Sequence, residues 1–176
     1  HGKRNDLNDI LNHHNSTWRY KSVEFHQFIN TLRNYNQSHE HKVYLYGCEM
    51  QYVKSDADRV QDYLISVGSN FKVHSFEKHL WQSFTDDELS DLYIHLAQLK
   101  KLFKNNKPQF IHKSSEKEYS IAFHHVHVMG QFLTAIHQTF EQRKHDLRDI
   151  YIAENIEWIL YHQEVTSKAM YWAHNA

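Results

Sequence analysis

The scarcity of glycine and proline constrains the fold of this chain more than any other feature of its sequence. The 176 residues include 4 Gly and 1 Pro, well below the average shares of about 7% and 5%. Because these two residues interrupt helices and form most tight turns, the sequence predicts long helices with few tight turns. The 40% share of hydrophobic residues is enough for a buried core.

Apolar residues recur at helical spacing along most of the chain. The predicted helices span residues 5–13, 22–35, 56–67, 71–82, 85–103 and 116–140. Thr85-Asp86-Asp87-Glu88 and Ser115-Glu116-Lys117-Glu118 have the form of capping boxes before the last two helices. Those two helices are expected to form an antiparallel pair, joined by a loop over residues 105–113 that holds Pro108. Gly68 is expected to end the helix over 56–67.

Two short apolar runs have the length and composition of buried strands. Val43-Tyr44-Leu45-Tyr46 follows the helix over 22–35, whose apolar side is expected to face the core. Ala169-Met170-Tyr171-Trp172-Ala173 follows a further helix that is predicted after His145. Two helix–strand units predict two strands of one parallel sheet. The expected fold class is thus a predominantly helical α/β fold, with residues 1–53 and 145–176 in an α/β catalytic-type domain and residues 54–144 as a helical insertion.

The helix after His145 carries polar side chains on an otherwise apolar stripe. Arg148, Ile152, Asn155 and Ile159 recur at helical spacing. Because buried polar groups need partners, polar groups are expected opposite Arg148 and Asn155. Ligands bind at the carboxyl ends of strands in open α/β sheets, and a histidine suits acid–base chemistry. His174, directly after the second predicted strand, is therefore the first catalytic candidate.

The residues of this last segment resemble the erythromycin esterase family, which includes proteins labelled as succinoglycan biosynthesis proteins. The family pattern is an Arg-Asp pair, then Met-Ala-Glu-Asn, a helical Trp, and a strand that ends Trp-Ala-His-Asn. The chain matches it with Arg148-Asp149, Ile152-Ala153-Glu154-Asn155, Trp158 and Trp172-Ala173-His174-Asn175. A second part of the pattern is matched by Trp18, Glu24, Asn36, Gly47 and Gln51, with Glu49 where the family usually has aspartate.

The resemblance implies a hydrolase that attacks an ester or lactone carbonyl with a water molecule activated by His174, without a metal or another cofactor. Glu154 and Glu49 are the candidate catalytic carboxylates, either orienting the histidine or binding substrate hydroxyls. The residues expected to bind substrate or to support the site are Arg148, Asn155, Asn175 and Gln51. The family also has active-site residues upstream and a second histidine just downstream. Because the chain begins at His1 and ends just after a predicted strand, further segments are expected on both sides.

Two other functions remain open. One is a non-enzymatic helical binding module in which His174 is structural. The other is a helical metal site on His124 and His127, which lie three residues apart, completed by His95 or Asp91 from the facing helix. These helices lack a Glu-x-x-His pair, and a solvent-facing stripe explains the histidines without a metal. We therefore expect no bound metal.

Motifs for other kinds of hydrolase are weak or missing. No Gly-x-Ser-x-Gly turn supplies a serine nucleophile. Cys48 follows a predicted strand, but no base is assigned to activate it. As the single cysteine, Cys48 excludes an internal disulfide and permits a reducing compartment, so a cytoplasmic location is expected.

The charge balance limits the partners of the chain. Lys and Arg number 20 against 21 Asp and Glu, so no basic excess favours nucleic acid. No apolar run approaches the length of a membrane span, and no membrane partner is expected. The expected partner is a small-molecule ester or lactone.

Overall fold

The structure, a computed structural model, describes residues 22–138, 140–163 and 167–171. Within these ranges the chain forms six helices and no strand. It divides into two compact units, residues 1–46 and residues 47–176. The first unit holds α2 (Val23–Ser38), which begins at the N-cap Ser22 as the sequence predicts.

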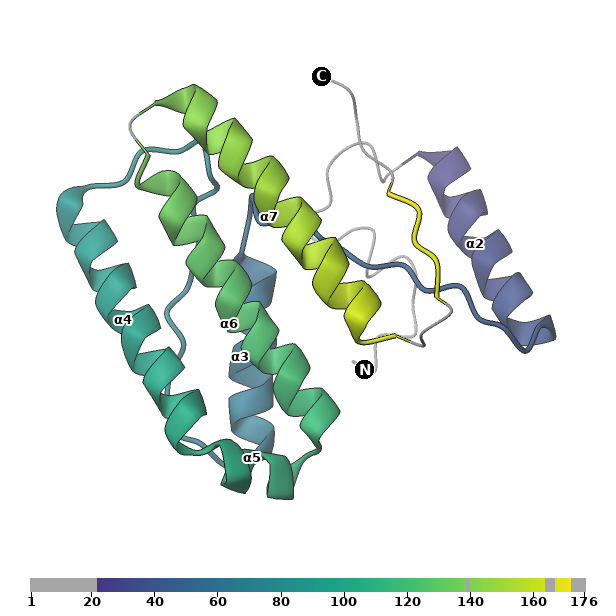
Figure 1. Cartoon of the computed structure of the whole chain (residues 1–176), viewed down its shortest axis with the longest axis horizontal. Helices are drawn as coiled ribbons and strands as arrows, with labels where there is room; N and C mark the ends of the chain where they lie inside the picture. The colour runs from purple at the N-terminus through teal and green to yellow at the C-terminus, as the bar shows by residue number, and fades with distance from the viewer. Residues whose placement is uncertain (1–21, 139, 164–166, 172–176) are drawn as a thin grey trace. The chain divides into compact units, whose positions relative to one another are not determined.

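The second unit is a helical bundle built around one central helix. Its helices are α3 (Lys54–Ser66), α4 (Asp86–Asn105), α5 (Lys107–Lys113), α6 (Glu116–Ile136) and α7 (Glu141–Tyr161). The four others all pack against α6 (Figure 1). Buried residues therefore lie around most of α6, as expected for a helix that is enclosed on several sides.

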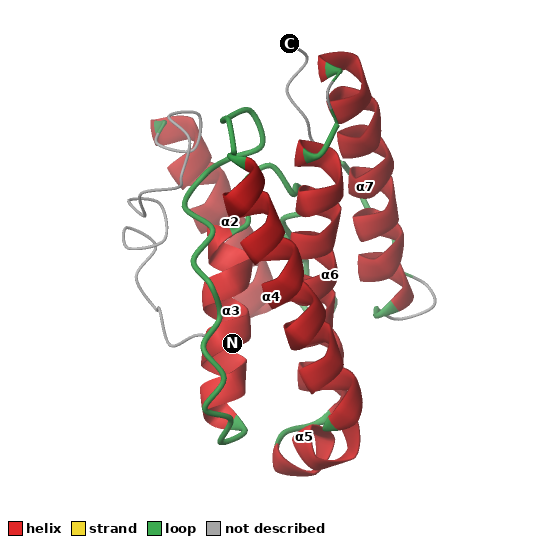
Figure 2. Cartoon of the chain, turned by 90° about the vertical axis from the view of Figure 1, so that its left-hand side faces the viewer, coloured by secondary structure: helices red, strands yellow, loops and turns green. Residues whose placement is uncertain are grey.

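The predicted antiparallel pair of long helices is confirmed by α4 and α6, which run side by side (Figure 2). Near one end of the pair, the Tyr93 hydroxyl donates to the Leu133 carbonyl at 2.9 Å. Near the other end, the Tyr119 hydroxyl donates to the Phe103 carbonyl at 3.2 Å. Each bond joins the beginning of one helix to the end of the other, which fixes their opposite directions.

The segment that joins this pair is the short helix α5, so the predicted loop over residues 105–113 is wrong. Pro108 lies in the first turn of α5. The missing N–H of proline is harmless there because the first N–H groups of a helix have no intrahelical acceptor. Proline thus marks the beginning of a helix here rather than an interruption.

An aromatic cluster around Phe103 joins α3, α4, α5 and α6. Phe103 is fully buried. The centres of the four neighbouring rings lie 5.6–5.8 Å from its own; these rings belong to Tyr63, Phe110, Tyr119 and Phe123. Aromatic pairs at such distances stabilise a core by about 0.5–1.5 kcal/mol beyond the area that they bury.

The helix predicted over residues 71–82 is wrong, because this connection between α3 and α4 is not helical. The side chain of Gln61 on α3 forms hydrogen bonds with two backbone groups of this segment. Gln61 Oε1 accepts from the Val73 N–H at 2.9 Å, and Gln61 Nε2 donates to the Phe71 carbonyl at 3.3 Å. Phe76 and Leu80 of the same segment are buried, so tertiary contacts decide its conformation. The predicted end of α3 is confirmed, since Gly68 has the positive φ of 72° typical of a helix terminus.

The predicted parallel sheet is not present in the described residues. Val43, Tyr44, Leu45 and Tyr46 form no strand and are 44–63% exposed. Both the N–H and the C=O of Val43 bond the Asn36 side chain, each at 2.8 Å, so these groups are not free for a neighbouring strand. In the second run, residues 169–171 are exposed and not in a strand, while residues 172–173 lie outside the described ranges.

The apolar side of α2 also differs from the expectation. No residue of α2 is buried, although the sequence predicts a core-facing side. The helix predicted over residues 5–13 lies outside the described ranges. The part of the fold class that the structure confirms is therefore its predominantly helical character.

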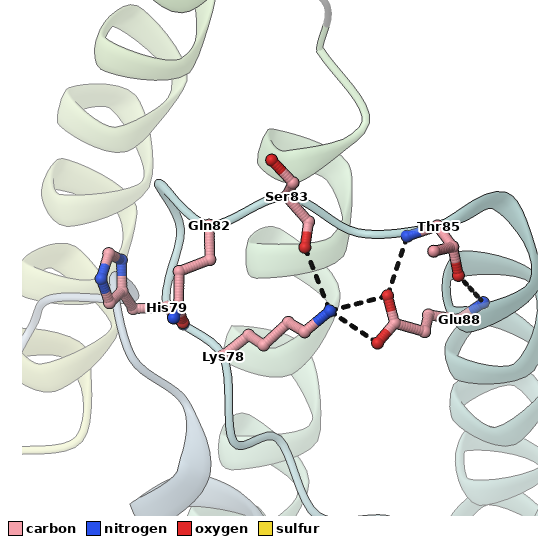
Figure 3. Close-up of polar contacts among 6 residues, drawn as sticks. All are labelled: Lys78, His79, Gln82, Ser83, Thr85 and Glu88. Atoms are coloured by element: carbon pink, nitrogen blue, oxygen red, sulfur yellow. Dashed lines mark hydrogen bonds and ion pairs between the residues drawn. The ribbon is translucent and has the colours of Figure 1, made fainter.

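A complete capping box begins α4, as the sequence predicts (Figure 3). Thr85 Oγ1 accepts from the Glu88 N–H at 3.2 Å, and the Thr85 N–H donates to Glu88 Oε2 at 2.8 Å. Lys78 donates to both oxygens of the same carboxylate at 2.6 and 2.7 Å. These contacts, led by the Lys78 hydrogen bonds, lower the pKa of Glu88 and link the connecting segment to the helix.

Thr85→Ala should lower the free energy of unfolding by about 1 kcal/mol, because the Glu88 N–H at the beginning of α4 loses its acceptor, Thr85 Oγ1. Chemical denaturation followed by circular dichroism measures the change. The matched control is Ser90→Ala at an exposed position inside α4, which should be neutral or slightly stabilising. Equal stabilities of the two variants would contradict this role of the capping box.

Candidate functional site

An ion pair joins α7 to the segment that precedes α3. Arg148 Nε donates to Glu49 Oε2 at 2.7 Å, and Arg148 Nη2 bonds the same oxygen. About one third of each side chain is exposed, 30% for Arg148 and 34% for Glu49. Burial opposes the charge on Arg148, but the hydrogen bond and the negative charge of Glu49 prevail and raise the pKa of Arg148. The guanidinium thus holds the Glu49 carboxylate in one position.

Two turns further along α7, the amide of Asn155 holds the same segment. Asn155 is buried, and its Nδ2 donates to the Cys48 carbonyl at 3.1 Å and to Gln131 Oε1 at 3.0 Å. Gln131, also buried, donates through Nε2 to Glu154 Oε2 at 3.1 Å. The prediction that Arg148 and Asn155 have polar partners is therefore confirmed. Arg148 bonds Glu49, and Asn155 bonds the Cys48 carbonyl and Gln131.

One acceptor in this network has no partner. Asn155 Oδ1 is the single fully buried side-chain oxygen or nitrogen of the described residues that makes no hydrogen bond. Buried acceptors are usually satisfied, so this oxygen is an exception among the described residues.

Cys48 and Tyr171 lie close to the ion pair. Burial, and then the neighbouring Glu49 charge, raise the pKa of Cys48, so the thiol is protonated at neutral pH. This disfavours a thiolate nucleophile. Burial raises the pKa of Tyr171, and Cys48 and Glu49 raise it further, while Arg148 opposes them. Tyr171 is thus near the ion pair, and it precedes His174 by three residues.

The structure brings four of the seven predicted site residues into these contacts: Glu49, Arg148, Glu154 and Asn155. Glu154 also lines an open surface depression together with Glu157, Trp158 and Tyr161. Gln51 contributes its backbone carbonyl, which accepts from the Leu80 N–H at 2.9 Å. His174 and Asn175 lie outside the described residues.

Two of the three histidines of α6, His124 and His125, differ from the expected solvent-facing stripe, whereas His127 is exposed. The His124 ring stacks on Trp158 of α7, with ring centres 3.8 Å apart and an angle of 4° between the planes. His125 is paired with Asp56 at 2.7 Å. Burial, followed by the charges of neighbouring histidines, lowers the pKa of His124 to about 3. In the part of the chain that is described, no three His, Cys, Asp or Glu side chains are grouped as metal ligands.

Gln131 and Tyr171 were not among the predicted site residues. Gln131 lies seven residues after His124 and four after His127, and this spacing puts all three on one side of α6. That side faces α7, where Trp158 and Glu154 lie. The polar stripe was thus visible in the sequence, but its orientation was not.

A sequence model of the erythromycin esterase family matches residues 1–176, the whole chain. The chain belongs to the erythromycin esterase family. This membership confirms the resemblance and suggests a hydrolase-like function. No curated protein and no solved structure matches the chain. No helix in the described ranges is long and apolar enough to cross a membrane.

A double-mutant cycle on Glu49→Gln and Arg148→Met should give a coupling free energy of about 1 kcal/mol, because solvent screening weakens a pair that is one third exposed. Chemical denaturation of the four proteins measures it. The matched control is the more exposed pair Lys54–Asp58, at 3.3 Å within α3, which should give only about 0.3–0.5 kcal/mol. Additive effects of the two substitutions would show that the ion pair does not hold Glu49.

His124 should make the fold sensitive to acid. Its pKa of about 3 in the folded state lies below the ordinary value of 6.5, so the unfolded chain binds the proton more readily. The neutral His124 ring therefore contributes to the free energy of unfolding in full above pH 6.5, and this contribution is lost as the pH falls toward 3. His124→Phe keeps a ring on Trp158 but does not titrate. Its melting temperature should therefore fall less than that of the wild type between pH 7 and pH 4.

The control for this comparison is His112→Phe at an exposed position of α5. It should retain the acid sensitivity of the wild type. Parallel melting curves for His124→Phe and the wild type would exclude His124 as a source of that sensitivity.

Proposed function

We propose that this chain carries part of the active site of an erythromycin-esterase-like hydrolase. In the proposed reaction, His174 takes a proton from a water molecule while the water oxygen attacks an ester or lactone carbonyl carbon. The C–O bond to the alkoxy group then breaks as the protonated histidine gives its proton to the leaving alkoxide, so that an ester yields a carboxylic acid and an alcohol and a lactone opens to one hydroxy acid. The reaction uses no cofactor, and its substrate is a small molecule.

The main support is the neighbourhood of Tyr171. This residue interacts electrostatically with Glu49 and Arg148. Three residues of extended chain reach at most about 10–11 Å, which limits the distance between His174 and Tyr171. In the proposed site the Glu49 carboxylate orients the imidazole of His174 and stabilises its protonated form, as a carboxylate does beside a histidine that acts as acid and base.

The two carboxylates have different surroundings, and this difference supports different roles. Both oxygens of Glu49 are engaged, Oε2 by Arg148 and Oε1 by the Met50 N–H at 3.0 Å. A carboxylate fixed in this way suits the orientation of His174. Glu154 lines the open depression on α7 and has one oxygen bonded to Gln131. Its other oxygen suits a substrate hydroxyl.

The remaining residues of the proposed site have supporting roles. Arg148 and Asn155 hold the backbone and carboxylate of residues 48–49 in place. Asn175, directly after His174 in the sequence, and Gln51, directly after the held segment, are proposed to bind substrate or support the site. The reactive carbonyl would then lie among groups from α7 and the two segments that contain Glu49 and His174.

The test is His174→Asn in the full encoded protein. Asparagine still forms hydrogen bonds but cannot take a proton from water. Turnover of a panel of esters and lactones should fall by about 10²–10⁴-fold, the usual contribution of a positioned acid–base group. Wild-type turnover should also fall on acidification, because a protonated imidazole cannot act as a base.

The control is His112→Asn, at the exposed position of α5, with thermal melting to verify folding. It should retain wild-type turnover. Equal turnover by a well-folded His174→Asn variant would remove His174 from the mechanism. A wild type that is inactive on the whole panel would favour a non-enzymatic binding module.

A further inference from the structure

Gln131 links two residues of the proposed site from a different helix. It lies in the buried part of α6 with 4% of its surface exposed. Its Oε1 accepts from Asn155 Nδ2 at 3.0 Å, and its Nε2 donates to Glu154 Oε2 at 3.1 Å. No other side chain of the described residues is hydrogen-bonded to the side chains of both Glu154 and Asn155.

The groups at the two ends of this network fix the orientation of both amides. The Cys48 carbonyl can only accept a hydrogen bond, so Asn155 must turn Nδ2 toward it. A carboxylate likewise accepts from Gln131, so Gln131 must turn Nε2 toward Glu154 and Oε1 toward Asn155. Turning either amide over would place two acceptors or two donors against each other.

We propose that Gln131 is a positioning residue of the proposed hydrolase, which holds the Glu154 carboxylate and the Asn155 amide in one arrangement. This inference rests on the proposed function. Both hydrogens of Asn155 Nδ2 are used, toward Cys48 and toward Gln131. Asn155 Oδ1 is left without a hydrogen-bond partner among the described residues. Without Gln131, the amide loses one of its two anchors and the Glu154 carboxylate loses its hydrogen bond.

Further charged groups surround Glu154. On α7 itself, Glu157 lines the same depression. On α6, His127 interacts electrostatically with Glu154, and burial together with Lys100 of α4 lowers the pKa of His127. The cationic Lys100 lies over Gly130, the residue directly before Gln131. A carboxylate at position 131 would therefore face Glu154, to which this side chain is hydrogen-bonded, with Lys100 and His127 as the nearby basic groups.

Two substitutions test the inference in the full encoded protein. Gln131→Met keeps the shape of the side chain and removes both hydrogen bonds. It should lower kcat by about 10–10²-fold, the effect of a small misplacement of reacting groups, with a smaller change in KM. Gln131→Glu keeps the acceptor toward Asn155 but places a second carboxylate against Glu154. Two ionised carboxylates repel, whereas a shared proton restores the hydrogen bond.

The decisive readout is the ratio of kcat for Gln131→Glu to kcat for the wild type. This ratio should rise as the pH falls, because protonation rebuilds the lost contact. Gln131→Met cannot recover in this way, and its ratio should stay constant. A residue that only stabilises the fold would not reverse its effect with pH among molecules that remain folded, as verified by thermal melting at each pH.

Gln142→Met and Gln142→Glu are the matched controls, since Gln142 is exposed on α7 and bonds only Asp146, at 3.0 Å. Both should retain wild-type kcat at every pH. If folded Gln131→Glu gives a ratio independent of pH, or if Gln131→Met keeps kcat within twofold of the wild type, the inference is overturned. The proposed function survives this outcome as long as the wild type hydrolyses the ester and His174→Asn does not. A wild type without hydrolysis overturns the proposed function and this inference together.

Discussion

The enclosure of α6 is the constraint on which the rest of the second unit depends. A helix that packs against α3, α4, α5 and α7 has buried residues around most of its circumference, so each buried polar group on it must find a partner within the protein. His125 pairs with Asp56, His124 stacks on Trp158, and Gln131 bonds to α7. The polar residues of α6 thereby determine which side of α7 faces it, and with that the position of the candidate site.

The helices could be predicted from the sequence because their signals are local. The capping box at Thr85, the turn at Gly68 and the apolar periodicity act within a few residues of each other. The strands could not be predicted in the same way, since a strand exists only with a paired neighbour. The run at Val43 bonds its own preceding helix instead, through Asn36. Residues 71–82 have helical spacing, but the distant Gln61 takes the backbone groups of Phe71 and Val73.

The candidate site was predictable to a similar degree. Arg148 and Asn155 on an apolar stripe required polar partners, and this requirement is a consequence of burial alone. The identity of those partners depends on contacts across the sequence, which periodicity does not contain. Gln131 is the clearest case: its spacing from His124 and His127 was visible, but only the packing of α6 against α7 turns that stripe toward Glu154.

The bonds from α7 to residues 48 and 49 close very long stretches of chain. They join residues that lie 99 and 107 positions apart, whereas the contacts within the α4–α6 pair span 16 to 40 positions. Because the entropy lost on closure grows with the length of the loop, the pair of long helices is favoured to assemble early. The residues around Glu49 then join α7 late in folding. The candidate site is accordingly among the last parts of the molecule to form, and its integrity reports on the whole bundle.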